Sequence, residues 1–236
     1  MLLWSWANLL FFNLSNQHQE ASIAEDAVNK PWRPLPSGRL SPAQAKRLFH
    51  YMYSTVIFIS LTIGGTLPSL AIICLSYWYD NRGGASSPWV KNVINGLGIG
   101  FFFTGPLEVI TGHSIFSGKG DGAIWVAIIM ATIASTSHAQ DLRDVEGDKA
   151  AGRETLPIAI GDTNARILAA IGILFWTWLA CWYWRAGWTQ GATAGLTGVA
   201  MSTNMFRDRT REGDIITWKF FPWWMLGIFL IPVLSQ

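Results

Sequence analysis

Three aspartates follow an apolar stretch of the chain at a regular spacing. Asp141, Asp144 and Asp148 come after the run from Ile124 to Ala139. If one helix continued through them, their i, i+3 and i+7 positions would place the carboxylates on one face. Like charges this close repel, and the dipole at a helix end disfavours them further, so a bound cation is expected. Oxygen ligands favour Mg²⁺, which commonly joins one or two carboxylates to a substrate phosphate. The alternative is a solvated, acidic helix end without a ligand.

A second polar group lies near the N-terminus. Asn13, Asn16 and Glu20 repeat the same spacing at the end of the first apolar segment. Polar side chains in a membrane helix are costly unless they face the bundle interior, so Asn16 and Glu20 are candidate catalytic groups and metal ligands. The alternative is that these residues only mark where the helix leaves the bilayer.

Basic residues accompany both polar groups. Lys30 and Arg33 lie in a proline-rich loop, where they can direct cationic donors at an anion. Lys91 begins a later apolar segment and could reach a phosphate, and Lys149 and Arg153 follow the three aspartates. These five residues are the candidate diphosphate ligands. The alternative is that the basic loops only set the orientation of the chain in a membrane.

The composition indicates the elements that must position these groups. Half of the 236 residues are hydrophobic, 14 are Trp, and only 14% are charged, whereas charged residues make up about a quarter of a typical soluble domain. We therefore expect an all-α, multi-spanning membrane bundle forming one domain, residues 1–236. Eight apolar segments are predicted, and several of them are near the roughly 20 residues that a helix needs to cross a bilayer, although the third is short. They are about 1–20, 43–64, 67–79, 92–112, 122–140, 163–184, 188–206 and 216–234.

The distribution of positive charge predicts how this bundle is oriented. Fifteen of the 17 Lys and Arg residues fall in the loops after the first, third, fifth and seventh segments. Because basic loops stay on the cytoplasmic side, both acidic groups are predicted to face the cytoplasm. His138, about one turn before Asp141, is expected to form hydrogen bonds near the site instead of binding metal.

Two stretches of the sequence resemble a known family. The segment from Asn29 to Gly38, and the pattern of Asp141, Asp144 and Asp148 followed by Gly152-Arg153 and Thr155-Leu156-Pro157, are similar to the UbiA superfamily of intramembrane prenyltransferases. The resemblance implies a bundle of nine helices, of which this chain is expected to contain about eight and to lack the first. It also implies two acidic motifs that bind Mg²⁺ and an isoprenyl diphosphate.

The first of these family motifs is altered in this chain. Asp26 matches its last acid, whereas Gln19 and Ser22 stand where the other two would be. The resemblance makes Asp26 a further candidate metal ligand. The chain instead has the pairs Asn16-Gln17 and Glu25-Asp26. This pattern is similar to a fungal branch of the family that includes membrane-bound terpene cyclases.

The resemblance and the residues together predict a Mg²⁺-dependent intramembrane enzyme that ionises farnesyl diphosphate or a similar substrate and cyclises it to a terpene. The alternatives are a prenyltransferase acting on an aromatic or other acceptor and a non-catalytic membrane homologue. Besides substrate and lipid bilayer, no nucleic-acid or obligate protein partner is expected. By family resemblance, the membrane is expected to be of the endoplasmic-reticulum type.

Overall fold

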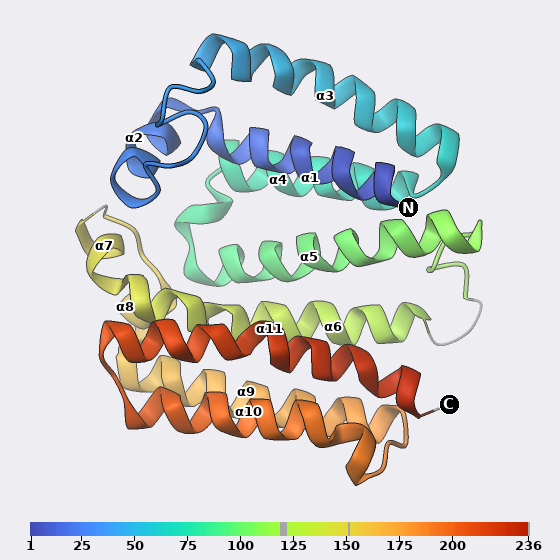
Figure 1. The fold of residues 1–236 in the computed structure, drawn as a ribbon, viewed down its shortest axis with the longest axis vertical. Coiled ribbons are helices and arrows are strands. Elements are labelled where there is room, and N and C mark those ends of the chain that lie inside the picture. Colours follow the sequence, from blue (N-terminus) through green and yellow to red (C-terminus); the bar gives the residue numbers. More distant parts are fainter. Residues whose placement is uncertain (119–121, 151, 236) are drawn as a thin grey trace. The chain divides into compact units, whose positions relative to one another are not determined.

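Helices form the ordered framework of this protein (Figure 1). The structure is a computed structural model that describes residues 1–118, 122–150 and 152–235, without the side chains of residues 21, 25, 28, 29 and 150. No strand occurs within these ranges. By its contacts the chain divides into two compact units, Met1–Ala85 with Leu97–Ala127 and Ser86–Gly96 with Ile128–Gln236. Each unit is described by itself, and the single domain remains a prediction.

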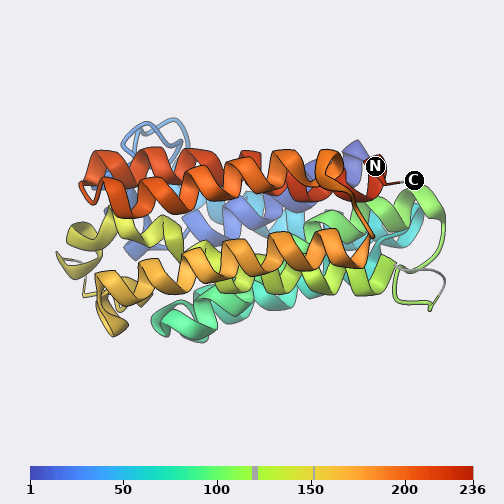
Figure 2. The ribbon, with the colours of Figure 1, turned by 90° about the horizontal axis from the view of Figure 1, so that it is seen from below.

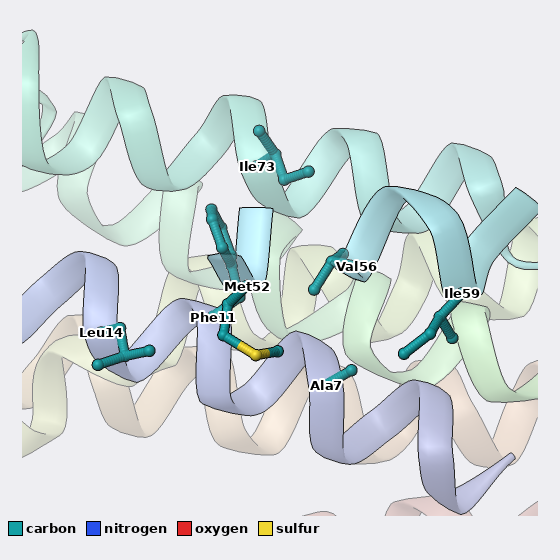
Figure 3. Close-up of a cluster of buried hydrophobic side chains, with 7 residues drawn as sticks. All are labelled: Ala7, Phe11, Leu14, Met52, Val56, Ile59 and Ile73. Carbon is teal, nitrogen blue, oxygen red and sulfur yellow. The ribbon is translucent and has the colours of Figure 1, made fainter. Parts of the chain in front are cut away.

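The first unit is built around its N-terminal helix. It contains α1 (Leu2–Gln17), α2 (Glu20–Asn29), α3 (Pro42–Ile63), α4 (Thr66–Asn81) and most of α5 (Pro88–Thr111). Helix α1 packs against α3 and α4. The buried side chains at this contact are shown in Figure 3: Ala7, Phe11 and Leu14 from α1, Met52, Val56 and Ile59 from α3, and Ile73 from α4. Their helical spacing gives α1 an apolar stripe that removes this face from solvent.

A tight turn joins α3 to α4, at the break between the predicted segments 43–64 and 67–79. Gly64 and Gly65 adopt φ angles of 98° and 71°, which residues with a Cβ rarely adopt. The carbonyl of Gly65 accepts a hydrogen bond from the indole nitrogen of Trp4, at 3.2 Å. This bond connects the start of α1 to the turn.

The second unit contains the three aspartates and the C-terminal helices. Its elements are a 3₁₀ helix η2 (Ser137–Asp144), α7 (Val145–Ala150), α8 (Leu156–Ile160), α9 (Asp162–Tyr183), α10 (Trp188–Arg207) and α11 (Arg211–Leu234), with the start of α5 and the end of α6 (Gly122–Thr136). A short 3₁₀ turn, η1 (Gly84–Ser86), lies at the division between the units. Helices α10 and α11 run side by side (Figure 2). Gly227 permits this contact, because a Cβ there would lie 2.5 Å from the backbone nitrogen of Ala194.

A buried arginine connects three elements at one end of the second unit. Both terminal nitrogens of Arg166 donate to the carboxylate of Asp214, at 2.6 and 2.8 Å, and its Nε donates to Asp162 at 2.9 Å. The carbonyl of Met205, near the end of α10, accepts a further hydrogen bond from Arg166. Arg166 is one of the 15 basic residues that were assigned to the cytoplasmic loops from their positions in the sequence. It is instead the buried centre of a polar network.

The predicted all-helical fold is confirmed, although two details differ. The first segment is interrupted after Gln17, because Gln19 is extended with φ −79° and ψ 143°. Glu20 therefore begins a separate helix, and its predicted place on one helical face with Asn13 and Asn16 is wrong. The second difference is the short helix α8, which lies outside the predicted apolar segments.

Four of the described helices are long and apolar enough to cross a bilayer, compared with eight predicted segments. They are Pro88–Thr111, Gly122–Lys149, Asp162–Tyr183 and Arg211–Leu234. Helix α4, at 16 residues, is shorter than the roughly 20 residues that a helical crossing needs.

Candidate active site

The backbone of η2 determines how the first two aspartates lie. Helix α6 ends at Thr136, and the next eight residues wind as a 3₁₀ helix before α7 begins. The predicted α-helical face carrying all three aspartates is therefore wrong. Because a 3₁₀ helix has three residues per turn, His138, Asp141 and Asp144 line up along one side. Asp148 is carried separately, by α7.

Asp141 is the buried acid of this group. Its side chain is 6% exposed, and its Oδ1 accepts a hydrogen bond from the ammonium of Lys91 at 2.9 Å. Its other oxygen, Oδ2, is buried without a hydrogen-bond partner in the described part of the chain. A buried carboxylate oxygen of this kind is costly unless another group or ion contacts it.

His138 connects η2 to α9. Its Nε2 lies 3.0 Å from the carbonyl oxygen of Ala165 and donates to it, because a carbonyl only accepts. The ring is fully buried. Ala165 precedes Arg166, so the position of η2 is coupled to the helix that carries the buried polar network.

Asp144 is more accessible than Asp141. Its side chain is 50% exposed and lies 3.4 Å from Nε of Arg143. The guanidinium of Arg143 also lies over the ring of Trp218, 5.9 Å from its centroid. An exposed ion pair of this kind contributes little to stability, so the carboxylate of Asp144 can exchange partners at small cost.

Asp148 and Arg153 are brought together by the turn that ends α7. The backbone N–H of Gly152 donates to the carbonyl of Lys149 at 3.1 Å, and that of Arg153 donates to the carbonyl of Asp148 at 2.9 Å. Gly152 has φ 65°, the left-handed conformation that this helix ending requires. Lys91, Asp141 and Arg153 all act electrostatically on the carboxylate of Asp148. Lys149 itself is exposed.

In the first unit, the predicted site residues have different surroundings. Arg33 donates from one guanidinium nitrogen to both oxygens of Asp26, at 2.9 and 2.6 Å, and Asp26 is 5% exposed. Asn16 and Lys30 are partly buried, and Glu20 is exposed. Asp26 and Arg33 therefore form an ion pair in the structure. The sequence had predicted that Asp26 binds the metal and that Arg33 binds the diphosphate.

Another carboxylate, missed by the sequence analysis, lies beside the end of α1. Asp80, in the last turn of α4, accepts a hydrogen bond from the hydroxyl of Ser15 at 2.6 Å. Burial raises the pKa of Asp80 above its ordinary value, opposed by this bond and by the charge of His18. No sequence motif marked it, since its role depends on the packing of α4 against α1.

We tested whether these residues suit a metal ion. In residues 1–118, 122–150 and 152–235, no three His, Cys, Asp or Glu side chains are grouped closely enough to hold a metal by themselves. However, the unpartnered Oδ2 of Asp141 is a hard oxygen donor. This donor set fits Mg²⁺ that is shared with substrate phosphates, since Mg²⁺ often uses only one or two carboxylates. It does not form an all-protein cage.

The second unit also has a cavity of about 680 Å³, away from the predicted site residues. Its lining comes from the end of α9 and the following turn: Trp178, Cys181, Trp182, Tyr183, Arg185 and Ala186. None of the candidate residues contributes to it.

Comparison with known proteins identifies the family. The sequence profile of the UbiA prenyltransferase family matches residues 1–226. The chain belongs to this family. The UbiA resemblance read from the motifs is thereby confirmed, and with it the membership of this chain in a family of membrane-integral enzymes.

Two fungal relatives of this UbiA chain are named for terpene formation. Fumagillin beta-trans-bergamotene synthase from Aspergillus fumigatus is 30% identical, over 99% of this chain and 80% of the relative. A diterpene cyclase from Hericium erinaceus is 33% identical, over 77% of this chain and 57% of the relative. The chain therefore matches most of the first relative and less than two thirds of the second.

Solved structures support the UbiA fold. A structure of digeranylgeranylglyceryl phosphate synthase matches with a TM-score of 0.70 and 20% identity, covering 100% of this chain and 86% of the other. A UbiA homologue from Archaeoglobus fulgidus matches with a TM-score of 0.61 and 17% identity, covering 100% and 88%. At these identities the comparison establishes the fold alone.

Proposed function

We propose that this UbiA-family enzyme ionises an isoprenyl diphosphate in the membrane and cyclises the resulting carbocation to a terpene hydrocarbon. The observation that carries the proposal is Asp141, a buried carboxylate with Lys91 on one oxygen and no partner on the other. Such an arrangement suits a metal–diphosphate head group. Its metal ion would contact the free carboxylate oxygen of Asp141, and its anionic oxygens would accept hydrogen bonds from Lys91.

The proposed role of each site residue follows from its charge. Asp141, Asp144 and Asp148 would hold Mg²⁺, with Asn16, Glu20 and Asp26 proposed as ligands from the first acidic region. When bound, Mg²⁺ supplies positive charge that stabilises the leaving diphosphate. Lys91 has three N–H donors, so it can keep its bond to Asp141 while donating to a phosphate oxygen. Arg153, beside Asp148, offers a planar guanidinium for the same anion.

Lys30, Arg33 and Lys149 complete the proposed set of diphosphate ligands. Arg33 has further donors besides the nitrogen bound to Asp26, so binding of an anion need not break that pair. Lys30 precedes Arg33 in the same turn-rich segment, and exposed Lys149 stands beside Asp148. Positive groups around a leaving anion stabilise charge as it develops there.

The proposed reaction balances within the substrate itself. The carbon–oxygen bond to diphosphate breaks, and its electron pair leaves with the diphosphate. The allylic carbocation is then attacked by a double bond of its own chain. Loss of a proton from the cyclised cation gives the neutral hydrocarbon, and diphosphate is the other product.

Two fungal relatives named as terpene-forming enzymes favour cyclisation. Prenyl transfer is the second candidate, favoured by the family description. The difference between these reactions is whether the carbocation is captured by its own chain or by a second molecule.

The test uses membranes containing the full chain, with Mg²⁺ and farnesyl or geranylgeranyl diphosphate, in the presence and absence of an aromatic acceptor. Cyclisation predicts hydrocarbon and diphosphate without acceptor, both lost in Asp141→Ala. A prenylated adduct formed only with acceptor would replace cyclisation by prenyl transfer. Absence of turnover under all conditions would favour the non-catalytic alternative.

A further inference from the structure

The start of α5 carries a buried polar residue that none of the proposed roles uses. Asn92 directly follows Lys91 and is 3% exposed. Its side-chain oxygen accepts a long hydrogen bond from the hydroxyl of Ser137, at 3.4 Å. Its amide nitrogen, Nδ2, is buried without a hydrogen-bond partner among the described residues.

The surrounding helices hold this residue against η2. Gly96, one turn further along α5, lies so close to α6 that an added Cβ would be 2.5 Å from the carbonyl oxygen of Met130. Two contacts then connect the start of α5 to η2: Lys91 with Asp141, and Asn92 with Ser137. Asn92 is therefore fixed on the same side of α5's first turns as the cation of the proposed site.

An unpartnered buried donor has a thermodynamic cost. Leaving such a group without a hydrogen bond destabilises a protein, whereas an apolar side chain of similar shape avoids that loss. A ligand that presents an acceptor oxygen would recover it. A diphosphate has many such oxygens, and the adjacent Lys91 and the open oxygen of Asp141 suit a metal-bound anion.

We infer that Asn92 is a diphosphate-binding residue, whose Nδ2–H donates to a phosphate oxygen beside Lys91. The inference rests on the proposed function, which it deepens by adding a neutral donor to the charged ligands. A neutral amide adds direction to the site, because it forms a hydrogen bond at one orientation while ammonium groups attract an anion from any side.

The experiment measures binding of inorganic pyrophosphate with Mg²⁺ to the full chain in lipid nanodiscs, by calorimetry and by the shift in thermal unfolding midpoint. Asn92→Leu should weaken pyrophosphate affinity about ten-fold, the effect of losing one hydrogen bond to a charged group. Without ligand, its unfolding midpoint should equal or exceed that of the unaltered chain. Asn92→Asp keeps the shape but removes the donor and adds negative charge, so it should weaken binding further.

Asn95→Leu is the matched control, since it makes the same chemical change one turn along α5 at a partly buried position. It should leave pyrophosphate affinity within about two-fold. Unchanged affinity in Asn92→Leu, or equal or tighter binding by Asn92→Asp, would overturn the inference. So would failure of the unaltered chain to bind pyrophosphate. Turnover of farnesyl diphosphate is measured separately, so pyrophosphate binding without turnover would count against the proposed function and leave Asn92 as an anion ligand.

Discussion

The two acidic regions differ in how their carboxylates are satisfied. In the first unit, Asp26 shares both oxygens with Arg33, and Glu20 is exposed. In the second, Asp141 shares only one oxygen with Lys91 and keeps the other buried and unpartnered. The comparison teaches that counting acids in a motif is a poor guide to its capacity for a ligand. The capacity to bind a ligand depends on whether a carboxylate has an oxygen without a hydrogen-bond partner in the protein.

The largest expected effect tests this difference directly. Asp141→Asn should lower the rate of diphosphate release about 10³-fold, the scale reported for loss of one group that stabilises transition-state charge. Asp26→Asn should lower it about ten-fold or less, because its charge is already compensated by Arg33. Both rates are measured in membranes with farnesyl diphosphate. Equal losses in the two variants would contradict the proposed asymmetry.

The second prediction concerns stability. Arg166→Met leaves Asp214 buried without its partner, which should lower the free energy of unfolding by about 3–5 kcal/mol. Adding Asp214→Leu should restore most of that loss, because both charges are then absent. Unfolding is followed in detergent by circular dichroism. A double variant no more stable than Arg166→Met would show that the arginine acts through packing instead.

The matching change in the first unit should be milder. Arg33→Ala removes a pair in which the arginine side chain is 29% exposed, so water can partly solvate the remaining Asp26. We expect a loss of about 1 kcal/mol in the free energy of unfolding. Arg33→Lys keeps the positive charge but loses the guanidinium group. Comparing it with Arg33→Ala distinguishes the contribution of the charge from that of the guanidinium hydrogen bonds. A loss as large as that of Arg166→Met would remove the distinction between the two regions.

These contrasts show what the sequence could and could not predict. Apolar segment lengths predicted most helix positions, including the break between segments 43–64 and 67–79 that separates α3 from α4. The winding of η2 could not be read from the spacing of Asp141 and Asp144, because i, i+3 pairs occur in both helix types. Nor could Arg166 be distinguished from a loop charge, since its burial depends on Asp214, 48 positions later. Asp80 and Asn92 likewise gain their roles only from packing.

The smallest expected effect is a pH dependence at Asp80. Its pKa is raised in the folded chain, so the folded state holds this proton more tightly than the unfolded state. Stability is therefore greatest below the ordinary value of 3.8 and falls as the pH rises through the folded pKa. Asp80→Asn avoids this loss and keeps a side-chain oxygen that can accept the hydrogen bond of Ser15. At pH values above the folded pKa of Asp80, the variant should therefore be more stable than the unaltered chain by less than about 1 kcal/mol.

Asp208 supplies the opposite control for that measurement. Hydrogen bonds from Thr210 lower the pKa of Asp208. Its contribution is therefore present above 3.8 and is lost as the pH falls through the folded value. Free energies of unfolding measured from pH 3 to 8 should show Asp80→Asn and Asp208→Asn diverging in opposite directions. Parallel curves would contradict both assignments.

The eight residues of η2 also act as a spacer of fixed length. At about 2.0 Å per residue they extend about 16 Å, whereas the same residues in an α-helix would extend about 12 Å. Rewinding them as α-helix would retract Val145 by about 4 Å and turn Asp144 about 60° out of line with Asp141. The alignment of the two acids therefore depends on the 3₁₀ winding of the backbone between them.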